Sequence, residues 1–430
     1  MVPSGRTFGR SGESTVADTP DAATGSAPAG TGRGEASAPV TVTGGRGAQL
    51  QSSGLRHGWT TGACATAATT AAYTALLTGE FPDPVVITLP KGQRPAFALA
   101  AEQLGGPPAG PPGGEPAGDG VAAGPWAMAA VVKDAGDDPD VTHGAVVRST
   151  VRAGAPGSGV VFRAGPGVGT VTKAGLPLAV GEPAINPVPR QMMREAVASV
   201  AARYGGAGDV EIEISIDNGA EIARSTWNPR LGILGGLSVL GTTGIVVPYS
   251  CSAWIDSIRR GVDVARAAGR THVAGCTGST SEKVAVAEHG LPQDALLDMG
   301  DFAGAVLKYL RRHPVDRLTI AGGFAKLSKL AAGHLDLHSS RSQVDKGFLA
   351  GLAAEGGADA ELVAAVAAAN TGLEAIVLCR AAGVPLGDLV ARAARATALG
   401  VLREAPVAVD VICIDRGGTV VGRAEPLANR

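Results

Sequence analysis

The chain has 430 residues with a net charge of −2, and this balance excludes a protein that binds nucleic acid through a basic surface. Its 63 glycines and 28 prolines exceed average usage, and only 3% of residues are aromatic, which is typical of disorder. A hydrophobic fraction of 45% nevertheless predicts a folded core, and the length fits two domains.

The N-terminus has no apolar segment of the kind that a secretory signal needs, and we find no candidate transmembrane helix. The five cysteines are scattered and never form a Cys-x-x-Cys pair, so neither a disulfide framework nor a cysteine zinc site is expected. These observations predict a reduced, cytoplasmic protein. The cysteines are Cys64, Cys251, Cys276, Cys379 and Cys413.

The first part of the chain predicts a disordered tail over 1–53 and an α+β domain over 54–226. A second Gly/Pro-rich run, 104–125, lies between strand-like segments and predicts a disordered loop insertion. The predicted elements of this domain are a helix over 62–77 with Thr60 or Thr61 as its N-cap, strands over 84–89, 96–100, 127–133 and 145–151, a helix over 188–204 and a strand over 210–216.

After about residue 227 short apolar strands alternate with helices, which predicts an α/β domain over 227–430 with a mainly parallel sheet. The predicted elements are a helix over 253–268, a strand over 271–274, a helix over 301–312, a strand over 317–321, several further helices and a strand over 407–414.

The densest polar feature is the run 132–144, which follows an apolar strand. Crowded carboxylates repel one another, so at least one pKa is raised or a cation lies beside them. We interpret the run as an active-site loop with acid/base or hydrogen-bonding groups. A site for a hard cation is a weaker interpretation. The purely structural interpretation is an acidic surface turn. Its polar residues are Lys133, Asp134, Asp137, Asp138, Asp140, Thr142 and His143.

Other segments favour contact with an anionic or flat ligand, although each also fits a plain structural turn. The helix start at Thr60-Thr61 offers backbone amides to an anion, or is a simple N-cap over a buried thiol. Glycine turns lie at 165–169, 232–236, 241–244 and 321–333, without a dinucleotide fingerprint or P-loop. Candidate anion holders are Arg230, beside Pro229, and the helix pair Lys326 and Lys329.

The segments 55–64, 133–144, 181–187, 228–236 and 241–244, in this order, resemble the CbiD-type cobalt-precorrin-5B (C-1)-methyltransferases of anaerobic cobalamin biosynthesis. The resemblance runs from about residue 55 to residue 414. It implies methylation of ring carbon 1 of cobalt-precorrin-5B by S-adenosylmethionine, giving cobalt-precorrin-6A on the early-cobalt-insertion pathway to adenosylcobalamin. Cobalt then enters only as part of the substrate, and no protein-bound metal is expected.

With this resemblance the polar residues receive expected roles. The catalytic candidates are Asp134, Asp137, Asp138 and His143. The substrate-binding candidates are Thr60, Thr61, Lys133, Asn228, Arg230, Lys326 and Lys329. The candidates for binding the methyl donor are Gly241, Thr242, Thr243 and Gly244.

Two alternatives remain at this stage. One is a corrinoid-binding or pathway-assembly protein without catalysis, which would form no demethylated donor. The other is an ATP-dependent phosphotransferase, which the absence of a P-loop lysine disfavours. A homodimer is the base-rate expectation, and transient contact with neighbouring cobalamin-pathway enzymes is expected with it.

Overall fold

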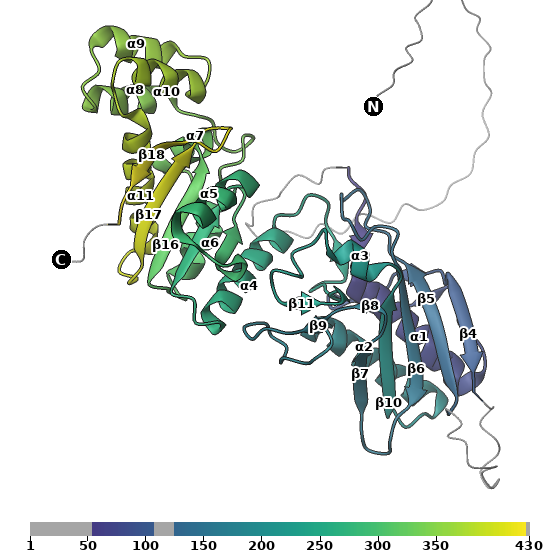
Figure 1. The fold of residues 1–430 in the computed structure, drawn as a ribbon. Helices are drawn as coiled ribbons and strands as arrows, with labels where there is room; N and C mark the ends of the chain where they lie inside the picture. Colours follow the sequence, from purple (N-terminus) through teal and green to yellow (C-terminus); the bar gives the residue numbers. More distant parts are fainter. Residues whose placement is uncertain (1–53, 107–123, 427–430) are drawn as a thin grey trace, which may run out of the picture. The chain divides into compact units, whose positions relative to one another are not determined.

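The computed structural model describes residues 54–106 and 124–426 (Figure 1). The predicted tail over 1–53 and most of the predicted loop insertion over 104–125 lie outside the described residues. Leu104 and Gly105 are described, and they belong to a strand rather than to the loop.

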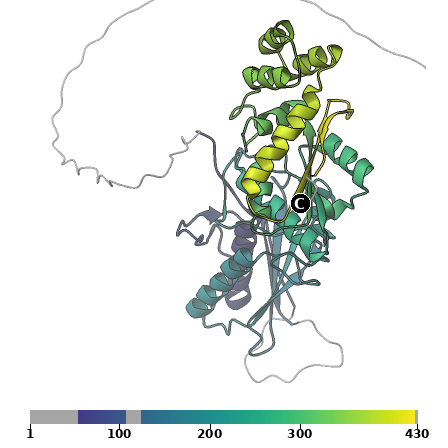
Figure 2. The ribbon, with the colours of Figure 1, turned by 90° about the vertical axis from the view of Figure 1, so that its left-hand side faces the viewer.

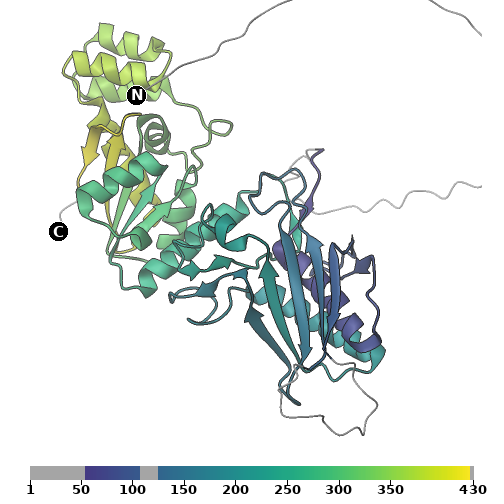
Figure 3. The same ribbon diagram turned by 45° about the vertical axis from the view of Figure 1, so that its right-hand side comes forward.

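The first large sheet has five strands, and all neighbouring strands are antiparallel except the last pair, which is parallel. The order is β4 (Ala101–Gly105), β5 (Trp126–Val132), β6 (Val146–Ala153), β10 (Val210–Ile216) and β7 (Val160–Ala164). The helices α1 (Thr61–Thr78) and α2 (Pro187–Tyr204) lie on one face of this sheet (Figure 3). This is the predicted α+β arrangement.

Helix α1 is buried over almost its whole length, because Ala, Gly and Thr side chains let other elements approach it on every side. It packs on β5 and β6 and also on α2. Inside this contact the hydroxyls of Thr69 and Ser149 are 2.8 Å apart, so a polar pair deep in the core is satisfied. Thr60 is the N-cap, as predicted, and its side chain accepts a hydrogen bond from the Ala63 amide.

The strand predictions hold best where the apolar pattern is long. The strand over 210–216 has the predicted bounds and alternates buried and half-buried side chains. The strand predicted over 84–89 is confined to β2 (Val85–Val86), which pairs with β3 (Ala96–Phe97). The strand predicted over 96–100 is confined to β3, and β4 was not predicted, because it is defined by pairing with β5, a partner beyond the Gly/Pro-rich run.

Three short pairings join residues 233–246 to the first region. They are β1 (Gly58–Trp59) with β13 (Ile245–Val246), β8 (Gly167–Val168) with β12 (Gly236–Leu237), and β9 (Thr170–Val171) with β11 (Ile233–Leu234). The short helix α3 (Gly219–Ala223) precedes them. The predicted boundary between 226 and 227 stays a prediction, and these pairings favour a later one, after β13.

The second large sheet is parallel except for one edge strand, as predicted for this region. Its order is β15 (Leu296–Asp298), β14 (His272–Cys276), β16 (Arg317–Gly323), β17 (Ala408–Ile414) and the antiparallel β18 (Val420–Ala424). The chain runs from β14 to β15 on one side and then crosses to β16 on the other. The carboxyl ends of β14 and β16 therefore flank a topological switch point.

Helices surround this second sheet. In chain order they are α4 (Ser252–Ala267), α5 (Ser279–His289), α6 (Ala303–Leu310), α7 (Phe324–Ala331), α8 (Lys346–Glu355), α9 (Ala360–Ala368), α10 (Gly372–Ala381) and α11 (Leu386–Leu402). Helix α11 packs against α7, β17 and β18, and α8, α9 and α10 pack on one another (Figure 2).

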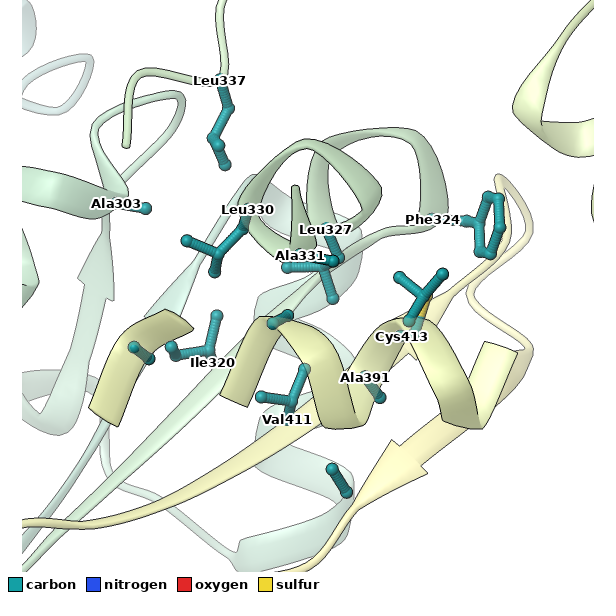
Figure 4. Packing of buried hydrophobic residues seen from close by; sticks show 14 of the residues in the cluster. Ala303, Ile320, Phe324, Leu327, Leu330, Ala331, Leu337, Ala391, Val411 and Cys413 are labelled. Carbon is teal, nitrogen blue, oxygen red and sulfur yellow. The ribbon is translucent and has the colours of Figure 1, made fainter. Parts of the chain in front are cut away.

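The core beneath α11 is built from aliphatic side chains. Ile320 and Val411 come from neighbouring strands, Leu327 and Leu330 come from α7, and Ala391 comes from α11 (Figure 4). Aliphatic and alanine side chains fill the space that aromatic rings fill elsewhere, so the low aromatic content accompanies a packed interior. No helix of the described residues is long and apolar enough to cross a membrane.

Candidate functional site

The acidic loop lies between β5 and β6 and is anchored from below by Lys133. This side chain is 2% exposed, and its ammonium donates to Asp140 at 2.5 Å. Asp140 also accepts from the amide and the hydroxyl of Thr142, at 2.8 and 2.7 Å. Burial opposes the charge of Asp140, but the ammonium and these hydrogen bonds outweigh it and hold its pKa below the usual value. The pair fixes the loop on the sheet.

Arg56 neutralises the other end of the loop. Two of its guanidinium nitrogens donate to the Asp134 carboxylate, one of them at 3.1 Å, and its backbone amide donates to Asp137 at 2.6 Å. The hydrogen bond from Arg56 is the main cause that lowers the pKa of Asp134. The cation partner expected from the sequence is therefore present, and Asp134 is ionised at neutral pH.

His143 and Asp138 occupy the outer part of the loop. The Ala135 amide donates to Nδ1 of His143 at 3.1 Å, so a neutral imidazole carries its proton on Nε2. The side chain of His143 is about half exposed, which leaves Nε2 free to meet a ligand. Asp138 accepts from the backbone amide of Tyr249 at 2.8 Å, and this bond joins the loop to the segment before α4.

The predicted helix-start site and the turn 241–244 lie against the same loop. The amide of Thr60 donates to the Gly244 carbonyl at 3.0 Å, and the amide of Gly62 donates to the Leu240 carbonyl at 2.9 Å. The amide of Trp59, next to Thr60, donates to the Asp134 carbonyl at 2.7 Å. Sequence segments 55–64, 133–144 and 241–244 are therefore joined to one another by backbone hydrogen bonds.

Close backbone contact explains why glycine is needed at two of these positions. A Cβ on Gly58 would lie 2.0 Å from the Ala135 carbonyl carbon, and a Cβ on Gly241, where φ is +133°, would lie 2.3 Å from Oγ1 of Thr60. Several amides predicted to face a ligand are thus already bonded within the protein. Thr242 is exposed, and Thr243 contacts Ile245. Donor binding at Gly241–Gly244 stays a prediction.

Asn228 and Arg230 hold the next turn together. Asn228 is buried; its amide nitrogen donates to the Gly236 carbonyl at 3.4 Å, and its oxygen accepts from Ser238. Arg230 donates to both oxygens of Glu282 at 2.6 and 2.9 Å and stacks over Trp227. The carboxylate that the sequence led us to expect for Arg230 is thus supplied, in this structure, by α5.

The two lysines of α7 differ although both follow the same strand. Lys329 is buried and donates to the Leu337 carbonyl at 2.8 Å, so it ties down the chain after α7. Lys326 is about one-third exposed, donates to the Thr277 carbonyl at 3.0 Å and lies 3.2 Å from Asp301. Of the two, Lys326 is the one accessible to a ligand.

The carboxyl ends of three parallel strands meet beside Lys326. Cys276 of β14 is in register with Asp298 of β15 and with Ala321 of β16. Burial, and then the negative charge of Glu282, raise the pKa of Asp298 above its usual value. A Cβ added at Gly278 or Gly323 would meet no atom of the described part of the chain within 4 Å, so these residues leave the backbone uncovered there. This edge combines open backbone with an acidic group whose charge is poorly compensated.

Sequence reasoning did not select Arg56, Glu282 or Asp298. Arg56 is far along the chain from Asp134, and Glu282 is similarly remote from Arg230, so neither pair has a local signal. Asp298 ends a three-residue strand that was not predicted. A usable signal was its distance from Gly278, because an acidic residue about 20 positions after a glycine turn often meets a ribose in nucleotide-binding folds.

Comparison with known proteins gives a consistent result. The family model for CbiD matches residues 48–248, and the model for the C-terminal domain of CbiD matches 336–425. The cobalt-precorrin-5B C(1)-methyltransferase of Paramagnetospirillum magneticum is 62% identical over 86% of this chain and 98% of its own length. The enzyme of that name from Brucella canis is 60% identical over 86% and 95%.

Among solved structures, the crystal structure of the cobalamin biosynthesis protein CbiD from Archaeoglobus fulgidus matches with 27% sequence identity and a TM-score of 0.35. The match covers 67% of this chain and 83% of that chain.

Proposed function

The chain belongs to the CbiD family, and from this membership we propose that it methylates ring carbon 1 of cobalt-precorrin-5B to give cobalt-precorrin-6A. The carrying observation is the 62% identity to a relative of that name over 98% of the relative's length. S-Adenosylmethionine supplies an already activated methyl group, and cobalt belongs to the substrate. The protein's task is therefore to hold donor and acceptor in line and to exclude water.

We assign the acidic loop to the chemistry. Asp134 is held ionised by Arg56, so it can stabilise positive charge but is a poor proton donor. His143 offers Nε2 to the macrocycle and is the group in the loop that we propose for moving a proton. Asp137 and Asp138 accept backbone amides, so their part is to shape the loop around the substrate.

The acetate and propionate groups of the substrate need cationic or amide partners. We propose Lys326 as the main contact, because its ammonium is partly exposed. Thr60, Thr61, Lys133, Asn228, Arg230 and Lys329 remain in the proposed set. The internal bonds of Lys133, Asn228, Arg230 and Lys329 favour a supporting role, in which they fix the backbone that meets the macrocycle.

For the methyl donor we favour the switch point between β14 and β16. The accessible glycines Gly278 and Gly323 allow close approach of an adenosine, and the under-compensated Asp298 carboxylate is a suitable acceptor for ribose hydroxyls. The turn Gly241–Gly244 is the alternative binding site for the methyl donor. It is connected to the acidic loop through neighbouring residues, because Thr60 bonds to Gly244 and Trp59 bonds to Asp134.

The function is tested with purified protein, S-adenosylmethionine and cobalt-precorrin-5B. We expect stoichiometric S-adenosylhomocysteine and methylated product. A corrinoid that binds without any S-adenosylhomocysteine being formed would replace this proposal with the carrier alternative. In the same assay His143→Gln is expected to lower kcat about 10²-fold or more. The control His334→Gln changes an exposed residue just after α7 and should leave kcat unchanged.

The donor seat is tested by calorimetric binding of S-adenosylhomocysteine. Asp298→Asn is expected to weaken binding about tenfold, and Asp316→Asn, an exposed control, is expected to have no effect. If Thr242→Val weakens binding and Asp298→Asn does not, the donor lies at Gly241–Gly244 instead.

We also propose a cytoplasmic location, since all five cysteines are free thiols. A homodimer and transient contacts with enzymes of the same pathway complete the proposal; light scattering on the purified protein tests the first, and co-purification tests the second.

A further inference from the structure

A second polar cluster lies at the opposite, amino-terminal edge of the parallel sheet. His272 begins β14, Asp410 lies near the start of β17, and His289 ends α5. One potential ligand atom from each of the three lies within 4.8 Å of the other two. The acidic loop and the carboxyl edge of the sheet make no use of these residues.

The geometry within the cluster does not match ordinary hydrogen bonding. Nε2 of His289 is buried and makes no hydrogen bond to any residue within 54–106 and 124–426, although it lies 3.4 Å from a carboxylate oxygen of Asp410. This is long for a charge-assisted hydrogen bond. It does match the edge of a zinc tetrahedron, because ligands about 2.0–2.2 Å from the metal are roughly 3.4 Å apart.

The neighbours of Asp410 leave one of its oxygens available. Arg317 donates to Oδ1 at 2.8 Å, and the Thr319 hydroxyl lies 2.8 Å from Nε2 of His272 and about equally close to both oxygens of Asp410. Hydrogen-bonded outer partners of this kind orient metal ligands. Oδ2, the atom near His289, accepts from Thr319 at 2.9 Å but has no bond to Arg317, so a lone pair of Oδ2 is left for a metal ion.

The alternative is a protonated His289 paired with Asp410. Such a pair would donate a hydrogen bond from Nε2 of His289 to Asp410, and the 3.4 Å contact is not one. Two imidazoles and one carboxylate oxygen converge here instead, and together they are a donor set for zinc.

We propose that His272, His289 and Asp410 bind one divalent transition-metal ion of the zinc class, with water in the fourth position. Arg317 repels a cation, so we expect micromolar rather than nanomolar affinity. The site lies on the amino edge of the sheet, and it is independent of the proposed methyl transfer. It would link the consecutive elements β14 and α5 to β17, which lies more than 100 residues further along the chain.

The test uses the full chain, stripped with a chelator and dialysed against buffered Zn²⁺. We expect one equivalent of bound zinc by elemental analysis and a rise in melting temperature on adding zinc. His289→Gln is expected to weaken binding at least tenfold while leaving the metal-free melting temperature close to wild type, because its Nε2 makes no hydrogen bond. His334→Gln, at an exposed position, is the matched control.

A second measurement does not depend on any variant folding. Co²⁺ bound in a four-coordinate site absorbs visible light far more strongly than the hydrated ion, so wild-type protein titrated with Co²⁺ should develop an intense band that saturates at one equivalent. Binding of no metal by wild type, or equal binding by wild type and His289→Gln, would overturn the proposal. Zinc that is lost equally from His334→Gln would overturn it too.

Discussion

The two sheets of this protein handle polar groups in opposite ways. Around the antiparallel sheet, Lys133 and Arg56 match the carboxylates of Asp140 and Asp134, so the loop is organised before any ligand arrives. At the carboxyl edge of the parallel sheet, Asp298 has a raised pKa and two glycines face open space. This contrast supports the proposal that the first region positions a reacting group and that the second binds a ligand.

The largest expected effect comes from breaking the buried pair under the acidic loop. Asp140→Asn leaves the ammonium of Lys133 buried without a counter-charge, and we expect a loss of about 3–5 kcal/mol in the free energy of unfolding. Urea denaturation measures it. The double variant Lys133→Met/Asp140→Asn should recover most of the loss, and a single variant as stable as wild type would show that the loop is not held in this way.

The second effect tests the link between Arg230 and α5. Glu282→Gln removes a partly buried bidentate acceptor, and we expect a loss of about 1.5–3 kcal/mol. Glu288→Gln is the matched control, since Glu288 makes the same two-bond contact with Arg423 in a more exposed place. Its loss should stay within about 1 kcal/mol. Equal losses of stability in the two variants would contradict the expectation that the more buried pair contributes more.

A smaller effect is expected from pH. The pKa of Asp140 is lowered on folding, so its stabilisation is complete above the unfolded pKa and is lost as pH falls through the folded value. The free energy of unfolding should therefore drop more steeply between about pH 5 and pH 3 in wild type than in Lys133→Met/Asp140→Asn. Parallel curves for the two proteins would contradict this account of the loop.

The smallest change in stability is expected at Arg56. This side chain is 59% exposed, so its ion pair is screened by water and Arg56→Met should change the free energy of unfolding little. Methyl transfer should fall by a larger factor, because Asp134 loses the guanidinium that orients it, whereas Asp137 keeps its bond to the backbone amide of residue 56. Arg163→Met, which removes an equally exposed pair with Glu211, should change neither stability nor rate appreciably. An unchanged rate of methyl transfer in Arg56→Met would show that the acidic loop takes no part in catalysis.

Sequence patterns were informative where one segment carries its own signal. The strand β10 alternates over its full length, and the helix α1 begins at a threonine cap, so both were predicted closely. The acidic loop was found because its residues are adjacent in the chain. β7 and β15 were missed because each is short and is defined by its partner strand.

The site's pairings were beyond the reach of the same patterns. Lys326 and Lys329 look alike in sequence, and only the path of the chain to Leu337 makes Lys329 a buried support. Arg230 was predicted to hold a carboxylate of the substrate, which stays a prediction, and the carboxylate in contact with it in the structure is Glu282 of α5. A partner that tertiary folding brings from a distant part of the chain cannot be predicted from the spacing of neighbouring residues.

The enclosure of α1 has a consequence for how this protein is made. A helix of Ala, Gly and Thr with no polar face gains little until something covers it, and its covers are β5, β6 and α2. All three are encoded after it, so during synthesis α1 leaves the ribosome well before its partners. Until α2 has emerged, the apolar residues of α1 stay exposed and can aggregate with other chains. A chain that is truncated before α2 would keep them exposed permanently.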